Sequence, residues 1–462
     1  MRPSRLLARP SWLAAVGALL AVGVAALARG RVHPDEVFQF LEPAHGLAFG
    51  YRVVAWEWVD GLRNQAVPGV LGGLLALCGA VGLEHPWALA AVVWCACAGV
   101  QALGTWALFR LVEERDGREA ALLAAGIHVT WGGFLIYAAR PIGDVLSAVP
   151  LLGALLWTQR ARDRDGWREG LWSGVLLGMA FVIRYPSAVF GVPLAASLLG
   201  ARRWRSLAGF SVGVGAVLLG LGVLDWLTWG SPWHSAWRYF QFNISSGSSA
   251  SQFGQRPWWW YAPILAGMAP LLLVWHFGRG LARRDVVVGA FAFYLVVVSA
   301  LGHKEARFLV PLLPLFVAIA AGPASGDLAR LSGRRRVLGL LVGLYVLSSV
   351  AAATVLFPVG LRAGVLDATV SAGRDPSLTG LVIAGPPEWN TGGRFYLHRD
   401  VPLFVGYGRP EAELQEKLSD ARFSHALVDG GAVGEDSLRS AGFCHQRQWG
   451  GVVLWKRCLR RD

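Results

Sequence analysis

The residues with the clearest chemical potential lie directly after a long apolar run, where the chain reads His33-Pro34-Asp35-Glu36. Pro34 suits the first position of a helix, so Asp35 is expected in the first helical turn. The dipole of that helix favours the ionised carboxylate, and an ionised carboxylate can act as a general base. We therefore predict that Asp35 is a catalytic base and that Glu36 assists or orients it.

A second group of charges lies near residue 304, in the stretch GHKEARF. Lys304 and Arg307 are three residues apart before an apolar run, so a helix starting there would point both to one side. Two cations at a helix start suit a phosphate, and His303 and Arg184 could assist them. A base together with a phosphate clamp describes group transfer from a lipid-linked phosphate donor.

The elements that must position these residues are membrane helices. Of the 462 residues, 54% are hydrophobic and 16% are charged, and the apolar residues form blocks. Runs such as 11–28, 206–227 and 337–357 are long enough to cross a bilayer as helices. Charged side chains at the ends of such spans usually anchor the helix in the membrane. For any single candidate residue, this anchoring role is the alternative to a catalytic or binding role.

The net charge of +13 could indicate a nucleic-acid partner, but its distribution argues against one. Arginines gather in short loops between the apolar runs, as the positive-inside rule describes. We therefore predict no nucleic acid, with these loops in the cytoplasm and the membrane lipids as the surroundings.

This topology predicts about eleven crossings within residues 1–358, with a first external loop at 30–65. One of the runs 66–83 and 87–109 is expected not to cross fully. The sequence Ala-Leu-Ala at 26–28 resembles a signal-peptidase site, so cleavage after the first run stays open. The remaining spans are expected at 119–139, 142–158, 171–184, 187–200, 207–228, 258–277, 286–302, 308–324 and 337–357.

From residue 359 the composition becomes mixed, which predicts a small external α/β domain over 359–462. Strands are expected within 378–385, 401–408 and 425–431, and a helix over 411–421. Cys444 and Cys458 could form a disulfide there if the domain faces an oxidising compartment. The histidines of this part (His398, His425 and His445) lack metal-ligand spacing and are interpreted as ordinary polar residues, so no metal site is predicted.

Several motifs together resemble the Alg9/PIG-B family of mannosyltransferases. The stretch 33–68 is similar to that family's opening, with HPDE, a Q-x-L-E-x-x-H helix and a tryptophan–glutamate–tryptophan motif at 56–58. Residues 303–316, HKEARFLVPLLPLF, are similar to its HKE-x-RF signature. Weaker similarities at 130–144, 180–189 and 224–261 keep the same order. The family's Arg-Ser is Arg63-Asn64 here.

The resemblance implies an all-α polytopic GT-C fold (glycosyltransferase family 22) whose first external loop carries the catalytic acid. It implies inverting transfer of mannose from a polyprenyl-phosphate donor to a lipid-linked glycan or glycolipid, without a nucleotide sugar. No metal or other cofactor is expected if the fixed cations serve the phosphate, and a metal site at Asp35 and Glu36 is the less favoured alternative. The implied catalytic residues are Asp35 and Glu36. The implied donor-phosphate residues are His303, Lys304, Arg307 and Arg184. The implied sugar- or acceptor-binding residues are His33, Trp56, Glu57, Trp58 and Arg63.

Three alternatives stay open at this point. A transporter or flippase for a lipid-linked sugar would place its polar site near the midplane between internal repeats, and the sequence shows no repeat. A transferase of the same fold could act on protein hydroxyls or on lipopolysaccharide. A structural membrane protein would leave the external charges unexplained. The preference for Arg over Lys and the abundance of Ala and Gly suggest a bacterial inner-membrane protein with a periplasmic site; a eukaryotic protein would have its site in the lumen of the endoplasmic reticulum.

Overall fold

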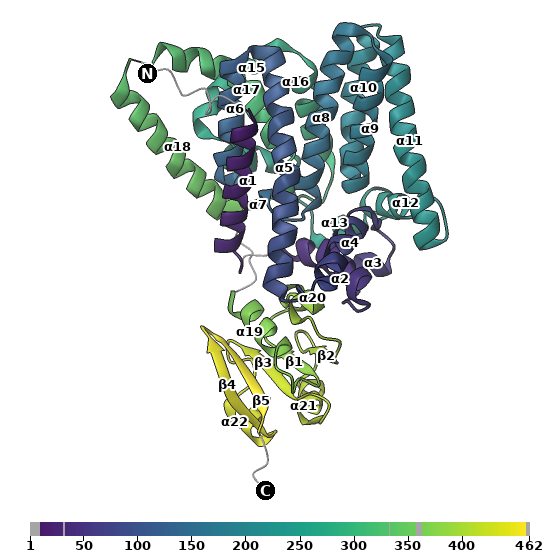
Figure 1. Cartoon of the computed structure of the whole chain (residues 1–462), viewed down its shortest axis with the longest axis vertical. Coiled ribbons are helices and arrows are strands. Elements are labelled where there is room, and N and C mark those ends of the chain that lie inside the picture. The colour runs from purple at the N-terminus through teal and green to yellow at the C-terminus, as the bar shows by residue number, and fades with distance from the viewer. Residues whose placement is uncertain (1–9, 31–32, 332, 357–362, 459–462) are drawn as a thin grey trace. The chain divides into compact units, whose positions relative to one another are not determined.

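The computed structural model describes residues 10–30, 33–331, 333–356 and 363–458 (Figure 1). Its contacts divide the chain into two compact units. The helical unit contains the described residues of 1–25, 60–66 and 93–358, and the mixed unit contains those of 26–59, 67–92 and 359–462. The mixed unit therefore joins most of the first external loop to the C-terminal part. The predicted boundary after residue 358 remains a prediction.

The helical unit is built from long apolar helices and short connecting ones (Figure 1). Its elements are α1 (Pro10–Leu27), most of α5 (Pro86–Asp116), α6 (Arg118–Thr130), α7 (Gly132–Ala138), α8 (Gly143–Arg164), α9 (Trp167–Ile183), η2 (Tyr185–Phe190), α10 (Gly191–Gly200), α11 (Trp204–Trp229), α12 (His234–Phe240), η3 (Gln241–Ser245), α13 (Ser248–Phe253), η4 (Trp258–Trp260), α14 (Tyr261–Met268), η5 (Leu271–Leu273), α15 (Val274–Gly280), η6 (Leu281–Arg283), α16 (Val286–Ala300), η7 (Ala306–Leu309), α17 (Leu312–Arg330) and α18 (Arg335–Leu356).

Five of the described helices are long and apolar enough to cross a membrane, namely α1, α5, α11, α17 and α18. Two bent pairs raise the number to seven: α6 with α7, bent by 63°, and the segments 258–268 and 271–283, bent by 105°. The predicted span 258–277 contains the second bend, so its crossing of the membrane stays a prediction. Of the two runs after the first loop, 66–83 forms a helix of only 15 residues, whereas 87–109 lies in the 31-residue α5. The count of about eleven includes shorter helices and stays a prediction.

Small residues allow α9 and α11 to pack closely. A Cβ atom at Gly170 or Gly174 would collide with the carbonyl oxygens of Ser206 and Phe210 on α11. Because the backbones approach so closely, main-chain and van der Waals contacts can hold the two helices together within lipid.

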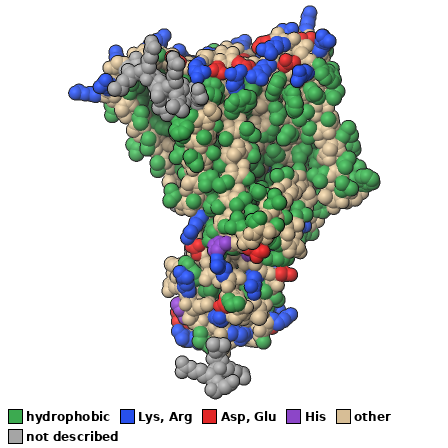
Figure 2. Space-filling model, in the orientation of Figure 1, with side chains coloured by type: hydrophobic (Ala, Val, Ile, Leu, Met, Phe, Trp, Pro, Cys, Tyr) green, Lys and Arg blue, Asp and Glu red, His purple; other side chains and the backbone are tan. Residues whose placement is uncertain are grey.

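The arginine-rich loops meet at one end of the helical unit, where Figure 2 shows a band of basic and acidic side chains beside a largely hydrophobic flank. Arg160 of α8 pairs with Glu114 of α5 at 2.6 Å, and Arg115 of α5 pairs with Asp285 at 3.2 Å. Loops that are far apart in sequence thus share one face, as the charge pattern predicted. The hydrophobic flank suits lipid contact.

The mixed unit contains a five-stranded sheet in the order β2-β1-β3-β5-β4. Its strands are β1 (Leu381–Ala384), β2 (Leu403–Val405), β3 (His425–Asp429), β4 (Phe443–Trp449) and β5 (Val452–Arg457). β1 pairs in parallel with β2 and β3, while β5 runs antiparallel to β3 and β4. Its helices are η1 (Glu36–Leu41), α2 (Glu42–Phe49), α3 (Trp56–Val59), α4 (Ala66–Ala80), α19 (Ala363–Gly373), η8 (Glu388–Asn390), α20 (Gly393–Leu397), α21 (Glu411–Ser419) and α22 (Glu435–Ser440).

Both faces of this sheet are buried, which accounts for the continuous apolar runs in its central strands. Leu381, Ile383 and Leu427 pack with α19 on one face, and Val382 and Ala426 pack on the other. The three predicted strands and the predicted helix at 411–421 are confirmed. The C-terminal hairpin of β4 and β5 was not predicted.

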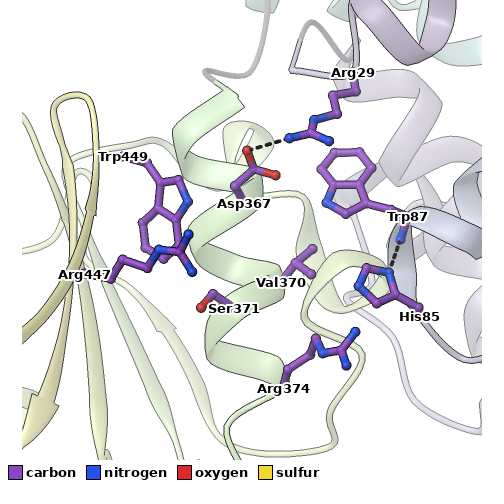
Figure 3. Close-up of a pocket in the computed structure, with 9 residues that line it drawn as sticks. All are labelled: Arg29, His85, Trp87, Asp367, Val370, Ser371, Arg374, Arg447 and Trp449. Carbon is purple, nitrogen blue, oxygen red and sulfur yellow. Dashed lines mark hydrogen bonds and ion pairs between the residues drawn. The ribbon is translucent and has the colours of Figure 1, made fainter.

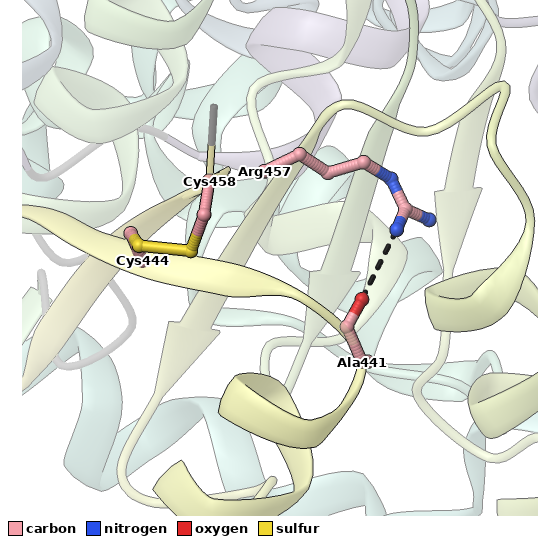
Figure 4. Close-up of a disulfide and its surroundings, with 4 residues drawn as sticks. All are labelled: Ala441, Cys444, Arg457 and Cys458. Atoms are coloured by element: carbon pink, nitrogen blue, oxygen red, sulfur yellow. Dashed lines mark hydrogen bonds between the residues drawn. A yellow bond between two sulfur atoms is a disulfide. The ribbon is translucent and has the colours of Figure 1, made fainter. Parts of the chain in front are cut away.

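The disulfide proposed from sequence is present: Cys444 on β4 is bonded to Cys458, which follows β5 (Figure 4). Next to it, Arg457 donates a hydrogen bond to the carbonyl of Ala441 at 3.0 Å. Replacing both cysteines with serine is expected to lower the stability of the mixed unit by about 3 kcal/mol, because the bond closes a short loop of the unfolded chain. Thermal unfolding with and without reductant measures this. A reductant effect of equal size in the double-serine variant would contradict it.

Candidate active site

The HPDE stretch opens a helix, as predicted. Pro34 is the first helical residue, and the Asp35 N–H donates to His33 Nδ1 at 3.1 Å. The next turns, Glu36–Leu41, form a π-helix. A π-helix has an extra residue in each turn, and such insertions are frequent at functional sites.

Gln39 connects two acidic residues of the first loop. Its amide nitrogen donates to Asp35 Oδ2, and it donates to Glu57 Oε1 at 3.1 Å. The Asp35 side chain is 16% exposed, whereas Glu36 is completely buried. Asp35 therefore retains access to an incoming hydroxyl group, which favours Asp35 over Glu36 as a base.

The two tryptophans that flank Glu57 lie in different environments. Trp56 is 42% exposed, so it can offer a ring face to a sugar. Trp58 is only 3% exposed, and its indole N–H donates to the carbonyl of Phe38 at 3.0 Å. Because Trp58 packs inside the unit, the predicted sugar contact stays with Trp56 and Glu57.

The same helix also fastens the loop to the C-terminal part of the chain. Glu42 is buried and accepts the N–H of Val53 at 2.5 Å and that of Phe395 at 2.6 Å. His45 contacts the Tyr51 carbonyl through Nδ1 and His398 through Nε2, both at 3.0 Å. In the Q-x-x-E-x-x-H spacing, Gln39 thus contacts the carboxylates of Asp35 and Glu57, whereas Glu42 and His45 make structural bonds.

Burial controls the charges of this connection. It raises the pKa of Glu42 to about 7, although the two backbone donors and Arg394 oppose the shift. Burial also lowers the pKa of His45 to about 4, with the Tyr51 carbonyl opposing and His398 adding to the shift. A neutral His45 is therefore expected near neutral pH.

In the helical unit, several predicted cations gather around Phe308. The guanidinium of Arg184 lies 5.2 Å from the Phe308 ring centroid, and that of Arg307 lies 5.6 Å from it. Arg184 donates to Asp144 at 2.9 Å, and both side chains are buried. Arg184 ends α9 and Asp144 begins α8, so this ion pair joins the two helix ends.

Glu305 orients two of the predicted phosphate ligands. It accepts from Arg307 through both oxygens, at 2.7 and 2.9 Å, and lies 3.1 Å from His303 Nε2. The bidentate contact fixes the guanidinium plane. Glu305 was not predicted as a site residue.

The prediction that Lys304 and Arg307 begin one helix is wrong. Residues 303–305 form a non-helical loop, and the first helical turn, η7, begins at Ala306. The Lys304 ammonium donates to the carbonyls of Arg256 and Leu301. Lys304 therefore connects two loops, and its predicted role toward a phosphate stays a prediction.

Arg63 belongs to a short segment, 60–66, that is held within the helical unit. Its carbonyl accepts from Trp229 at 3.0 Å, and its guanidinium lies 5.8 Å from the Tyr239 ring. Asn64 donates to Val182 and Tyr185, which flank the position of Arg184. Arg63 and Arg184 are therefore fixed by the same group of elements.

The structure thus assembles the candidates in two sets. His33, Asp35, Glu36, Trp56, Glu57 and Trp58 lie in the mixed unit, and Arg63, Arg184, His303, Lys304 and Arg307 lie in the helical unit. Reasoning from sequence assigned no site role to Gln39, Asp144 and Glu305, which contact the candidates, or to Glu42, which fastens the loop. Among the described residues, no group of three or more His, Cys, Asp or Glu side chains could hold a metal ion.

Breaking the Asp144–Arg184 pair is expected to destabilise the helical unit. Asp144→Asn and Arg184→Gln should each cost about 3–5 kcal/mol, because each removes one partner of a buried ion pair. The loss of stability in the double variant should be clearly smaller than the sum of the losses in the two single variants. Thermal unfolding in detergent measures this, with the exposed Glu435→Gln as the control, expected to change stability by about 0–1 kcal/mol. Strict additivity of the two single variants would contradict the coupling.

Known proteins resemble this chain in sequence and in fold. The model of the Alg9-like mannosyltransferase family matches residues 13–365. "GPI mannosyltransferase 3" of Yarrowia lipolytica is 27% identical over 385 residues, covering 80% of this chain and 72% of that protein. "GPI alpha-1,2-mannosyltransferase 3" of Xenopus laevis is 26% identical over 321 residues, covering 67% of this chain and 58% of that protein.

A solved structure with the same fold is that of ArnT from Cupriavidus metallidurans, bound to undecaprenyl phosphate. It superposes with a TM-score of 0.65 at 14% identity, covering 97% of this chain and 98% of ArnT. At this identity the similarity shows the fold alone. The chain has the GT-C fold that the resemblance implied.

Proposed function

Because this chain belongs to the Alg9-like mannosyltransferase family, we propose that it transfers mannose from a polyprenyl-phosphate donor to a lipid-linked glycan or glycolipid. The observation that carries the proposal is the arrangement around Asp35, a carboxylate held by Gln39 yet still accessible at a helix start. The relatives named as GPI mannosyltransferases support mannose as the sugar. The fold relative bound to undecaprenyl phosphate supports a lipid donor.

The reaction would be a single displacement with inversion. Asp35 removes the proton of the acceptor hydroxyl, whose oxygen forms a bond to the anomeric carbon. The bond from that carbon to the phosphate oxygen breaks on the opposite face, and polyprenyl phosphate leaves with the bonding electrons. Arg184 and Arg307 would stabilise the charge that grows on this phosphate, which is the main electrostatic demand of the transition state.

Two further parts of the proposal follow from residues of the chain. Trp56 and Glu57 would hold a sugar ring, with His33 and Arg63 assisting on the acceptor side. The guanidinium groups could supply the charge that a metal supplies in other transferases, so a chelator is expected to leave the rate unchanged.

The location of the active site is also proposed. The arginine-rich loops would lie in the cytoplasm and the catalytic carboxylates on the opposite face of the membrane. This face would be the periplasm or exterior of a bacterium, or the lumen of the endoplasmic reticulum. The Cys444–Cys458 disulfide supports an oxidising compartment for the C-terminal part.

The test uses purified chain in nanodiscs with radiolabelled polyprenyl-phosphate mannose and a membrane lipid extract. Label is expected to enter a new glycolipid or lipid-linked glycan, and the labelled product identifies the acceptor. Movement of intact donor between leaflets, without a labelled product, would instead support a flippase. Label in protein or lipopolysaccharide would indicate another acceptor on the same fold.

A further inference from the structure

The mixed unit contains a polar pocket whose lining includes neither Asp35 nor Glu57. It encloses about 410 Å³ and is lined by Arg29, His85, Trp87, Asp367, Val370, Ser371, Arg374, Arg447 and Trp449 (Figure 3). One side is helix α19, and the other sides come from the turn after α1, the segment that opens α5 and strand β4. Its volume lies in the range of small-molecule sites, so it exceeds what an inorganic ion alone would need.

The charged side chains that line this pocket give it a net positive charge. Asp367 pairs with Arg29 at 3.2 Å, so one carboxylate offsets one guanidinium. Arg374 and Arg447 add two more cations on the α19 and β4 sides. A ligand that complements this pocket therefore carries negative charge, and guanidinium groups match the geometry of phosphate oxygens.

Two tryptophans line the pocket, and Figure 3 shows them on the two sides of helix α19. Arg29 lies 5.2 Å from the Trp87 ring centroid, and Arg447 lies 4.9 Å from that of Trp449. Contact with an indole ring restricts the conformations of the arginine side chain. The side chain therefore loses less conformational entropy when it binds an anion. The flat apolar walls suit a ring of the size of a sugar or cyclitol.

The pocket also offers uncharged hydrogen-bonding groups. The backbone N–H of Trp87 donates to His85 Nδ1 at 3.2 Å, which leaves the hydrogen of a neutral ring on Nε2. Burial and the nearby charge of Arg374 both lower the pKa of His85, which favours this neutral form. The hydroxyl group of Ser371 lines the same space. Such donors and acceptors suit ring hydroxyl groups.

We infer that this pocket binds a phosphate-bearing ring of hexose size, and that it holds the anionic part of the acceptor during transfer. The second half of this inference rests on the proposed function, whereas the binding itself does not. The same chemistry could come from a lipid headgroup or from a soluble sugar phosphate. Arg374 and Arg447 hold the phosphate, and the indole rings of Trp87 and Trp449 contact the sugar or cyclitol ring.

The test measures binding by the full-length chain in nanodiscs. One arm titrates mannose 6-phosphate, with mannose and inorganic phosphate for comparison. The other arm uses phosphatidylcholine nanodiscs with and without phosphatidylinositol and detects the bound lipid. The variant is Arg374→Gln with Arg447→Gln, both exposed positions, and the matched control is Arg409→Gln with Arg422→Gln on the same unit.

The double variant is expected to bind its probe at least about ten-fold more weakly, since two charge-assisted contacts are lost. The control should bind like the natural chain. Mannose 6-phosphate binding that follows this pattern indicates a soluble ligand, and phosphatidylinositol binding that follows it indicates a headgroup. Failure of both probes, or equal binding by the double variant, would overturn the inference. The Asp35→Asn variant should bind the probes as the natural chain does. A failure of mannosyl transfer would therefore count against the proposed function and not against binding in this pocket.

Discussion

Replacing Asp35 with asparagine is expected to lower the rate of mannosyl transfer by about 10³-fold, the effect expected for loss of a general base. Asparagine keeps the size of the side chain, so the contact with Gln39 can persist through the amide oxygen. What disappears is the ability to accept the proton of the acceptor hydroxyl. The stability of the chain should change little, because Asp35 lies at a helix start and is partly exposed.

Initial rates with radiolabelled polyprenyl-phosphate mannose measure this effect. Asp60→Asn, an exposed carboxylate at the end of the same loop, is the matched control and should retain the full rate. Gln39→Ala should give a smaller loss than Asp35→Asn, because Gln39 positions the base without accepting the proton. If Asp35→Asn kept a rate close to that of the control, the assignment of the base would be wrong.

Replacing Glu42 with alanine is expected to destabilise the mixed unit strongly. Its carboxyl group accepts two backbone N–H groups, from Val53 and Phe395, and alanine leaves both without this acceptor. A buried donor without a partner costs about 1–3 kcal/mol, so the loss should be about 2–6 kcal/mol. Glu42→Gln should lose less, because one amide oxygen can still accept one of the donors.

Thermal unfolding and limited proteolysis of the purified chain measure this loss. The exposed Glu388→Gln is the control and should behave like the natural chain. In Glu42→Ala, proteolysis is expected to release the C-terminal part more rapidly. Transfer activity should fall as well, since α2 continues directly from the π-helix that carries Gln39. If Glu42→Ala unfolded and was proteolysed like the natural chain, the hydrogen bonds of Glu42 would contribute nothing to stability.

The same connection predicts a pH dependence. Between pH values of about 4.5 and 7 the folded chain binds more protons at Glu42 than the unfolded chain does, so this residue lowers stability as pH rises. His45 has the opposite effect between about 4 and 6.5. The groups facing the pair are Arg52 and Arg394 near Glu42, and His398 near His45.

The two effects oppose each other in the shared window, so stability should be greatest there and fall on both sides. The unfolding temperature as a function of pH measures this. Glu42→Gln should remove the decline on the alkaline side, and the decline on the acidic side should then begin at about pH 6.5, because only His45 acts. An unchanged alkaline decline in that variant would assign it to other groups.

Several features of the site could be predicted from local sequence. Pro34 fixed the start of the helix, because its ring suits only the first turn. The arginine-rich loops were found because charge placement follows topology, and the loops do converge at one end of the helical unit. The central strands were recognised from their continuous apolar runs, which both buried faces require.

Other features depend on contacts that local sequence does not encode. Gln39 reaches both Asp35 and Glu57 from a π-helix, a geometry that has no reliable sequence signal. Lys304 was predicted at a helix start but lies in a loop. Its ammonium group donates to the carbonyls of Arg256 and Leu301, and these hydrogen bonds hold the loop in place. Strand β4 was missed because most of its residues, such as Gln446, are polar and exposed.

The mixed unit also has a consequence for the order of biosynthesis. The Phe395 N–H that binds Glu42 is 353 residues further along the chain. A ribosome therefore produces the loop that contains Asp35 and Glu42 early, but the partner of Glu42 only after the membrane helices that intervene in sequence. The loop must wait through most of translation before its packing is complete. A chain released before Phe395 would carry Asp35 on an unfinished support, so premature termination would leave an inserted but incomplete enzyme.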